Sequence, residues 1–279
     1  MTITVEQFDN AISLELPQDA QEWARLFAAK QGDVATGKQV YLNTLAVYAL
    51  HHYLAQQSIE SDLEQSQSWY PHALSAPNAA DLLVPGVGRV ECRPVLLQAA
   101  TAFEIPDTAW DDRVAYVAIG IEERLDRVYL LGYLPVRSPD NLMQSIPFTQ
   151  LLPMADLPDH LHFLQEGLTW LESDDEVAVQ VRELQEVYSL THFVAQLETA
   201  YNETEDVFQD SRIADCLSGA ASEMGLTARE AVLKSPATFG LKAEDDLSEE
   251  DMEDMVGILA EDVLDKLRQI WGNRRRRVT

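Results

Sequence analysis

Cysteine is scarce in this chain of 279 residues, which contains only Cys92 and Cys216. Two cysteines argue against a disulfide framework and favour a reducing compartment, so we expect a cytoplasmic protein. Long apolar runs are also missing. The most apolar stretch, residues 44–54, is far shorter than the ~20 residues of a membrane span and includes two histidines. The first residues lack a positive region followed by an apolar run, so we expect neither a secretory signal nor a membrane span.

Basic residues are few. The chain has 20 Lys and Arg residues against 47 Asp and Glu residues, a formal net charge of −27. Such a charge repels nucleic-acid phosphates and anionic membranes and attracts basic surfaces. We therefore expect a basic protein partner and no direct contact with nucleic acid. The alternative is that the acidity only keeps the protein in solution.

The N-terminal part has helical periodicity. After an alternating stretch at 12–16, apolar residues recur at helical spacing over 20–28 and predict a first helix that ends near Gly32. A second helix is predicted up to Leu54, with Thr36 as its N-terminal cap. Two packed helices are therefore expected at the start of the fold.

The centre has the pattern of β-strands. Strands are predicted at 88–97, 113–121 and 127–135, the last two forming a hairpin, and helices are predicted at 161–171 and 176–201. The predicted fold class is α+β: an antiparallel β-sheet flanked by the N-terminal helix pair and by C-terminal helices. Three regions are expected, an α+β module at 1–165, a helical extension at 166–202 and an acidic region at 203–279.

The acidic region ends in a predicted amphipathic helix. Residues 203–265 contain 18 acidic and 4 basic side chains, a net charge of −14. Ser248 and Asp251 have the spacing of a capping box, and an apolar stripe at spacings of three and four follows them. The stripe docks either on its own protein or on a partner. The candidate partner-binding residues are Met252, Met255, Val256, Leu259, Val263, Leu267 and Ile270 in the stripe, with Glu249, Glu250 and Asp251 at the start of the helix.

The patterns that would indicate catalysis or ligand binding fail in their details. Residues 32–39 have the spacing of a phosphate-binding loop, but Gln39 replaces the required Ser or Thr and a helix precedes them, which indicates a helix–turn–helix connection. His160 and His162 point apart in a helix, which argues against a metal site. Cys92 lies in an apolar run that favours burial over nucleophilic use. We therefore assign no catalytic, cofactor-binding or metal-binding residue.

Among the runs with a familial character are Lys-Gln-Val-Tyr-Leu-Asn-Thr-Leu-Ala-Val-Tyr at 38–48, Glu-Cys-Arg-Pro-Val at 91–95 and Leu-Leu-Gly-Tyr-Leu-Pro at 130–135. Together they resemble a cyanobacterial family of unknown function, DUF1822. The resemblance covers about residues 10–165 and brings no known catalytic residues. It implies a cytoplasmic cyanobacterial protein, and the family's association with genes for alternative sigma factors and signalling proteins implies a regulatory, anti-sigma-like role.

Three functions are consistent with these observations. The first is a non-catalytic regulatory module that binds a basic partner, such as a sigma factor, through an acidic surface. The second is a small-molecule sensor or enzyme with a pocket between the first two helices and the sheet, near Arg93, Arg113 and Tyr116. The third is a structural subunit of a larger complex.

Overall fold

The chain divides into two compact units, Met1–His160 and Leu161–Thr279. The computed structural model describes residues 8, 10–66, 69, 79–97, 102–105, 113–122, 127–136, 145–184, 189–202, 209–223 and 249–272, and the side chains of all of these except 183–184, 209–210, 219–223 and 249–254. The first unit ends close to residue 165, the predicted end of the α+β module. The described helices of 166–202 and of 203–279 belong to one and the same unit.

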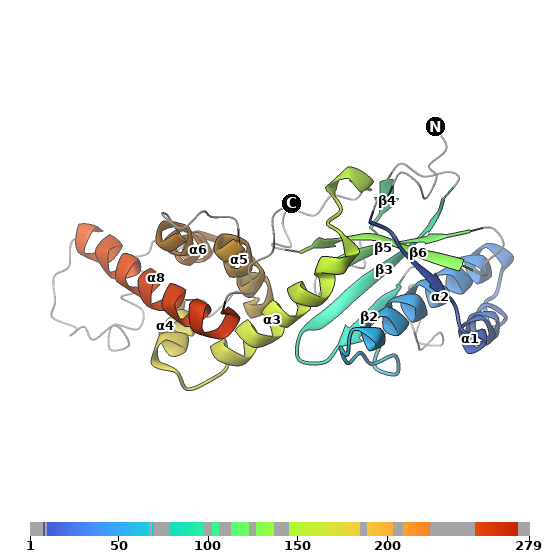
Figure 1. The fold of residues 1–279 in the computed structure, drawn as a ribbon, viewed down its shortest axis with the longest axis horizontal. Helices are drawn as coiled ribbons and strands as arrows, with labels where there is room; N and C mark the ends of the chain where they lie inside the picture. Colours follow the sequence, from blue (N-terminus) through green and yellow to red (C-terminus); the bar gives the residue numbers. More distant parts are fainter. Residues whose placement is uncertain are drawn as a thin grey trace. The chain divides into compact units, whose positions relative to one another are not determined.

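The first unit opens with β1 (Ile12–Glu15), which lies in the alternating stretch at 12–16. The two predicted helices follow as neighbours, α1 (Gln18–Ala28) and α2 (Val34–Gln56) (Figure 1). The cap of α2 is Asp33 rather than the predicted Thr36. The Asp33 Oδ1 atom accepts hydrogen bonds from the backbone N–H groups of Ala35 and Thr36, each at 2.9 Å. The Thr36 hydroxyl donates to Asp33 Oδ2 at 2.6 Å, and this bond contributes most to lowering the pKa of Asp33. Residues 32–39 thus run from the end of the connection between α1 and α2 into α2, in a helix–turn–helix arrangement as predicted, and do not follow a strand.

The described part of the chain contains a five-stranded sheet in the order β1-β6-β5-β3-β2. Its remaining strands are β2 (Asp81–Val84), β3 (Gly88–Leu96), β5 (Arg113–Ile121) and β6 (Arg127–Pro135). The last three match the predicted strands closely, and β5 pairs antiparallel with β6 as predicted. The α+β class is confirmed.

The sheet is mixed rather than purely antiparallel, which corrects one detail of the prediction. β3 and β5 run parallel, whereas the other neighbouring strands in this sheet run antiparallel. Parallel neighbours require a crossover connection. Between β3 and β5 lies β4 (Ala102–Glu104), which pairs instead with β7 (Ser145–Pro147) in a separate two-stranded sheet. Periodicity alone does not reveal the direction of a strand's neighbour.

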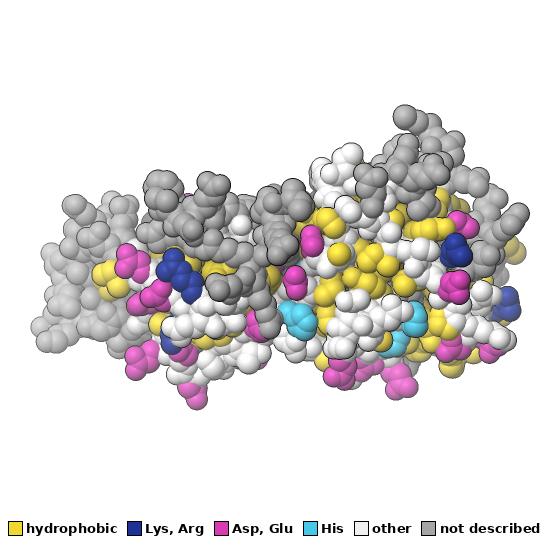
Figure 2. All heavy atoms as spheres, viewed as in Figure 1, with side chains coloured by type: hydrophobic (Ala, Val, Ile, Leu, Met, Phe, Trp, Pro, Cys, Tyr) yellow, Lys and Arg dark blue, Asp and Glu magenta, His cyan; other side chains and the backbone are white. Residues whose placement is uncertain are grey.

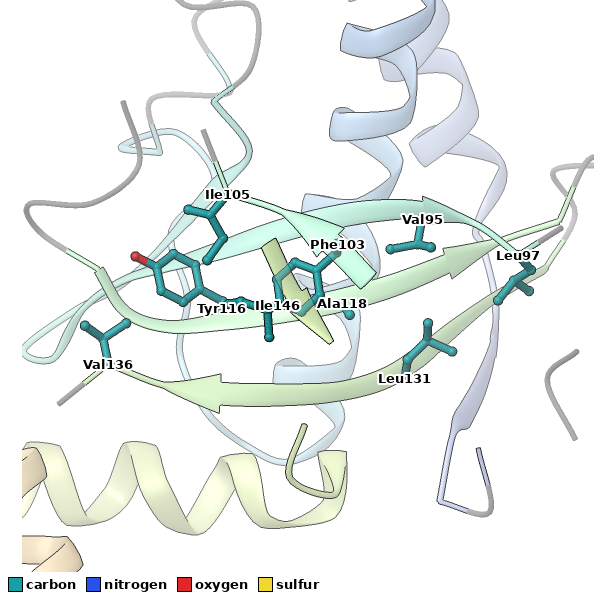
Figure 3. Packing of buried hydrophobic residues seen from close by; sticks show 9 residues of the cluster. All are labelled: Val95, Leu97, Phe103, Ile105, Tyr116, Ala118, Leu131, Val136 and Ile146. Carbon is teal, nitrogen blue, oxygen red and sulfur yellow. The ribbon is translucent and has the colours of Figure 1, made fainter. Parts of the chain in front are cut away.

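The two faces of the five-stranded sheet have different coverings. Figure 3 shows the face on the side of β4 and β7, with the blue α2 helix behind the strands. On this face lies a hydrophobic cluster of Val95, Leu97, Phe103, Ile105, Tyr116, Ala118, Leu131, Val136 and Ile146. Every residue of β5 is buried, because this central strand is covered on both faces.

The second unit consists of helices in the residues that the structure describes. They are the remainder of α3 (Leu157–Leu171), α4 (Glu176–Leu184), α5 (Leu190–Asn202), α6 (Gln209–Glu223) and α8 (Glu249–Trp271). The helix predicted at 176–201 is therefore two helices, α4 and α5. None of the helices described is both long and apolar enough to cross a membrane.

Trp271, the last residue of α8, is fully buried in the second unit. Its ring makes edge contacts with Phe163 and Tyr201, each at a centroid distance of 5.2 Å. The Tyr201 hydroxyl donates a hydrogen bond of 2.8 Å to the carbonyl oxygen of Gly272. Earlier in α8, Lys266 Nζ donates to Asp175 Oδ2 at 2.6 Å. These contacts fix the second half of α8 to α3, α5 and the start of α4.

Candidate functional site

Four aromatic rings meet at the packed helix pair of the first unit, and we call Trp23, Phe27, Tyr48 and Trp69 the aromatic cluster. The ring centroids of Trp69 lie 6.0 Å from Trp23, 5.2 Å from Phe27 and 6.3 Å from Tyr48. Trp23 and Phe27 are 5.5 Å apart. Phe27 is buried, whereas 42% of Trp23 is exposed. The cluster thus has a buried ring, that of Phe27, and a partly exposed ring, the indole of Trp23.

The position of Trp23 follows from the spacing of α1. Ala20, Ala24 and Phe27 form the buried stripe at positions i, i+4 and i+7. Trp23 and Leu26 lie outside this stripe and are 42% and 46% exposed. Small alanines therefore face the core, while the largest side chain of the helix faces solvent.

Acidic side chains border the exposed indole. On a helix, residues three and four positions apart are surface neighbours, so Asp19 is a neighbour of Trp23 and of Glu22, and Glu22 is a neighbour of Leu26. Both acidic residues are exposed. Both carboxylates accept hydrogen bonds. Glu22 Oε1 accepts one of 3.0 Å from the Gln18 side-chain amide, and Asp19 Oδ2 accepts one of 2.6 Å from the Tyr48 hydroxyl.

The hydrogen bond from Tyr48 to Asp19 links α2 to this acidic patch. Partial burial, together with the bond to Asp19 and its negative charge, raises the pKa of Tyr48 to about 12. The Tyr48 hydroxyl therefore stays protonated and continues to donate at neutral pH. The link orients the Asp19 carboxylate beside the cluster.

A histidine lies next to the cluster on α2. The ring of His51 makes an edge contact with Tyr48 at 5.9 Å, and its Nδ1 atom is hydrogen-bonded to Ser61 Oγ at 2.8 Å. Burial, and next the charge of His52, lower the pKa of His51, while Asp62 opposes this shift. The imidazole is therefore neutral at physiological pH and adds no positive charge to the patch.

The aromatic cluster already contacts one cation. Lys30 Nζ lies over the ring of Phe27, 5.7 Å from its centroid, which is within the range of a cation–π interaction. Arg25, a basic residue of α1, donates from Nη2 to Gln21 Oε1 at 3.2 Å. The exposed part of Trp23 is a further aromatic surface of the same cluster.

A second concentration of charge is buried in the sheet. Glu91 is fully buried, its Oε2 atom 2.9 Å from Arg113 Nε and its Oε1 atom 3.1 Å from Arg93 Nη1. The backbone N–H of Ala80 also donates to Glu91 Oε1 at 3.1 Å. Beside this group, the buried Asp81 forms an ion pair with Arg89. Both carboxylates and all three guanidinium groups thus form ion pairs within the fold, as expected for buried charges with a structural role.

The structure brings together the three residues of the predicted pocket, but on the other face of the sheet. Glu91 is in register with Tyr116, and Arg93 with Ala118, so these side chains share one face. Tyr116 belongs to the hydrophobic cluster of Figure 3, on the side away from α2. Arg93, Arg113 and Tyr116 therefore do not face the first two helices, because register and pleat direct them to the opposite side.

The candidate residues of α8 have unequal access to solvent. Four members of the predicted stripe are buried within the second unit: Val256, Leu259, Val263 and Leu267. In this fold these four side chains are not available to a partner, because they pack in their own unit. Met255 and Ile270 are half-buried, and the side chains of Met252, Glu249, Glu250 and Asp251 lie outside the described residues. Among the described side chains of α8, the large apolar residue that is exposed is Ile258, at 62%.

The remaining candidates have structural positions. Cys92 is buried as predicted, and burial raises the pKa of its thiol well above the usual value, which disfavours the reactive thiolate. His160 is buried in α3, with its ring 5.7 Å from that of Tyr133, and His162 is half-buried. Among the described side chains no group of three or more His, Cys, Asp or Glu residues is placed to hold a metal ion.

Sequence reasoning missed the aromatic cluster as a surface. The helical spacing of apolar residues over 20–28 predicts one apolar face and does not separate Trp23 from Phe27, and the contact of Trp69 with that helix depends on tertiary structure. One signal was present: a buried stripe of Ala20, Ala24 and Phe27 leaves Trp23 and Leu26 on the flank of α1. Large apolar residues flanking a stripe of alanines indicate a solvent-facing surface.

Comparison with known proteins identifies a family and no closer relative. No curated protein and no solved structure matches the chain. The family model described as a protein of unknown function, DUF1822, matches residues 14–233. The match continues well beyond residue 165, where the resemblance was expected to end, and includes α3 to α6. The chain therefore belongs to the DUF1822 family of proteins of unknown function.

Proposed function

We propose that this protein is a non-catalytic regulatory module that binds a basic surface of a partner protein through the aromatic cluster. The observation that carries this proposal is the partly exposed Trp23, supported from below by Phe27 and Trp69 and bordered by Asp19 and Glu22. Tryptophan and tyrosine are enriched among the residues that dominate binding energy at protein interfaces. A supported ring also loses little conformational entropy on binding.

The charge of the whole chain favours a basic partner. Acidic side chains are spread over the face of both units shown in Figure 2. With a net charge of −27, the protein attracts basic surfaces from a distance and repels phosphate groups. Long-range attraction and a local aromatic contact supply different parts of recognition, the first raising the association rate and the second slowing dissociation.

A basic transcription factor, such as a sigma factor, has the partner chemistry that this surface requires. We expect the two proteins to meet in the cytoplasm, because both cysteines of this chain are free thiols, as is usual in a reducing compartment. The buried charge network of the sheet supports this surface indirectly, by holding together the strands on which α2 packs.

An affinity experiment tests the proposal. The tagged full chain, its Trp23→Ala variant and its Ile258→Ala variant are used to capture proteins from a native lysate, at about 50 mM and about 300 mM salt. Ile258 is the matched control, because it is an exposed apolar residue in the other unit. We expect a basic protein to be captured at low salt, to be released as salt rises, and to be lost with Trp23→Ala but retained with Ile258→Ala.

Two results would contradict the proposal. One is capture of the same proteins by the wild type and by Trp23→Ala. The other is capture that does not change with salt, because an acidic surface that attracts a basic partner must be screened by ions.

A further inference from the structure

The aromatic cluster combines three properties that select a particular side chain of the partner. It contacts a cation through Phe27, it partly exposes a Trp ring, and it has two exposed carboxylates on the same helix surface, Asp19 lying one turn before Trp23. The strongest cation–π partner among side chains is the face of Trp. A neutral apolar ligand would use the ring but leave the carboxylates without a counter-charge.

The existing contact of Lys30 shows that a cation is stable at this cluster. The Lys30 ammonium lies 5.7 Å from the centroid of Phe27, the ring that also contacts Trp23 and Trp69. Because Phe27 is buried and Lys30 is exposed, the cation approaches the cluster from solvent. The exposed indole of Trp23 offers a larger and more electron-rich surface to a second cation.

The two neighbouring carboxylates add hydrogen-bond acceptors in fixed positions. Asp19 Oδ2 is occupied by the Tyr48 hydroxyl and Glu22 Oε1 by the Gln18 amide. Each oxygen of an ionised carboxylate has more than one acceptor site, so both groups retain acceptor capacity. A group that stacks on Trp23 while donating sideways to carboxylates must be planar and must have several N–H donors. Among side chains this describes the guanidinium group of arginine.

We infer that the site receives an arginine of a basic, exposed peptide segment of the partner, stacked on Trp23 and paired with Asp19 and Glu22. This inference rests on the proposed function and names the chemistry that the site recognises. Lysine fits less well, since its ammonium is a strongly hydrated point charge that does not stack as a plane. Anionic ligands are disfavoured by the same two carboxylates.

A peptide titration tests the inference. Three labelled peptides of equal length are compared by fluorescence anisotropy with the full chain: one rich in arginine, one with lysine at the same positions, and one with citrulline, which keeps the planar shape without the charge. We expect the arginine peptide to bind most tightly, the lysine peptide more weakly and the citrulline peptide weakest. Trp23→Ala should weaken the arginine peptide about three- to thirtyfold, the range of a cation–π contact. Trp23→Phe should have a smaller effect.

A charge-matched pair of variants separates local recognition from general attraction. The double variant Asp19→Asn, Glu22→Gln and the double variant Glu261→Gln, Asp262→Asn remove the same charge, the first beside Trp23 and the second from exposed positions of α8. We expect only the first to reduce the preference for arginine over lysine. Equal affinity for the arginine and lysine peptides, unaffected by Trp23→Ala, would overturn the inference and indicate attraction by net charge alone.

The outcomes separate this inference from the proposed function. If Trp23→Ala abolishes capture of the lysate partner but the peptides show no arginine preference, the partner-binding surface stands and the inference fails. If the peptides show the preference but no partner depends on Trp23, the arginine site stands and the proposed function fails. Circular dichroism of every variant shows whether the fold is retained, and the citrulline comparison needs no variant at all.

Discussion

Replacing Glu91 by glutamine removes the central carboxylate of the buried charge network while keeping its shape. The carboxylate contacts Arg113 Nε at 2.9 Å and Arg93 Nη1 at 3.1 Å, and both partners are largely buried. A glutamine at this position turns an NH₂ group towards at least one guanidinium donor. The Arg113 guanidinium, only 1% exposed, then loses the carboxylate that its Nε contacts.

Breaking a buried ion pair from one side typically destabilises a protein by about 3–5 kcal/mol. For a unit of this size, such a loss lowers the melting temperature by roughly 6–20 °C. The matched control is the same substitution at Glu15, whose partner Arg127 lies 3.8 Å away on the same sheet. Because Glu15 is 86% exposed, water screens this pair and the substitution should change the melting temperature very little.

Thermal unfolding followed by circular dichroism measures both variants. Hydrogen exchange of the β5 amides then assigns the shifted transition to the first unit. We expect a large shift for Glu91→Gln and almost none for Glu15→Gln. Shifts that agree within about 2 °C, which corresponds to at most about 1 kcal/mol, would refute the claim that the buried network stabilises the sheet.

Three further predictions concern single groups. Ultraviolet titration should show a tyrosine, Tyr48, that ionises near pH 12, and Asp19→Asn should lower its pKa, because the negative charge and the carboxylate acceptor are lost; an unchanged titration would contradict the link between these residues. The pKa of His51 is lowered in the fold, so the unfolded chain binds more protons and stability should fall as pH decreases through about 6.5; His51→Gln should flatten that part of the profile. Gly132→Ala should destabilise the first unit by about 1–3 kcal/mol, since φ is +156° and the new Cβ would meet a backbone oxygen at 2.7 Å. Gly257→Ala should stabilise the second unit by about 1 kcal/mol, because a Cβ at this position of α8 meets no other atom and alanine favours a helix more than glycine does. In denaturant unfolding, a Gly257→Ala variant less stable than Gly132→Ala would show that the geometry at these glycines is wrong.

Local patterns were sufficient to predict the elements that have a regular period and clear ends. The strands β3, β5 and β6 and the first two helices appear almost where periodicity placed them, because alternation and helical spacing are local properties. The capping residue of α2 was missed by three positions, since Asp33 and Thr36 are both suitable cap residues and only the backbone conformation decides between them. The helix predicted at 176–201 was not divided, although the structure ends α4 at Leu184.

The candidate site was less accessible to sequence reasoning. The α8 stripe was recognised as apolar, but a stripe that packs in its own unit and one that binds a partner have the same spacing. Burial of Val263 and Leu267 beside the anchored Trp271 is a tertiary fact. The aromatic cluster joins rings from α1, from α2 and from Trp69, which are distant in the sequence.

Composition, periodicity and motif spacing are properties of the chain, so the acidity of this protein, its α+β class, its main strands and its family follow from its residues. Three features follow only from the folded arrangement: β3 and β5 run parallel, Glu91 contacts Arg113, and the Trp23 ring is partly exposed. These outcomes depend on which distant segments pack together. Which segments pack together depends on the surface that they bury over the whole unit, so no short stretch of sequence is sufficient to predict it.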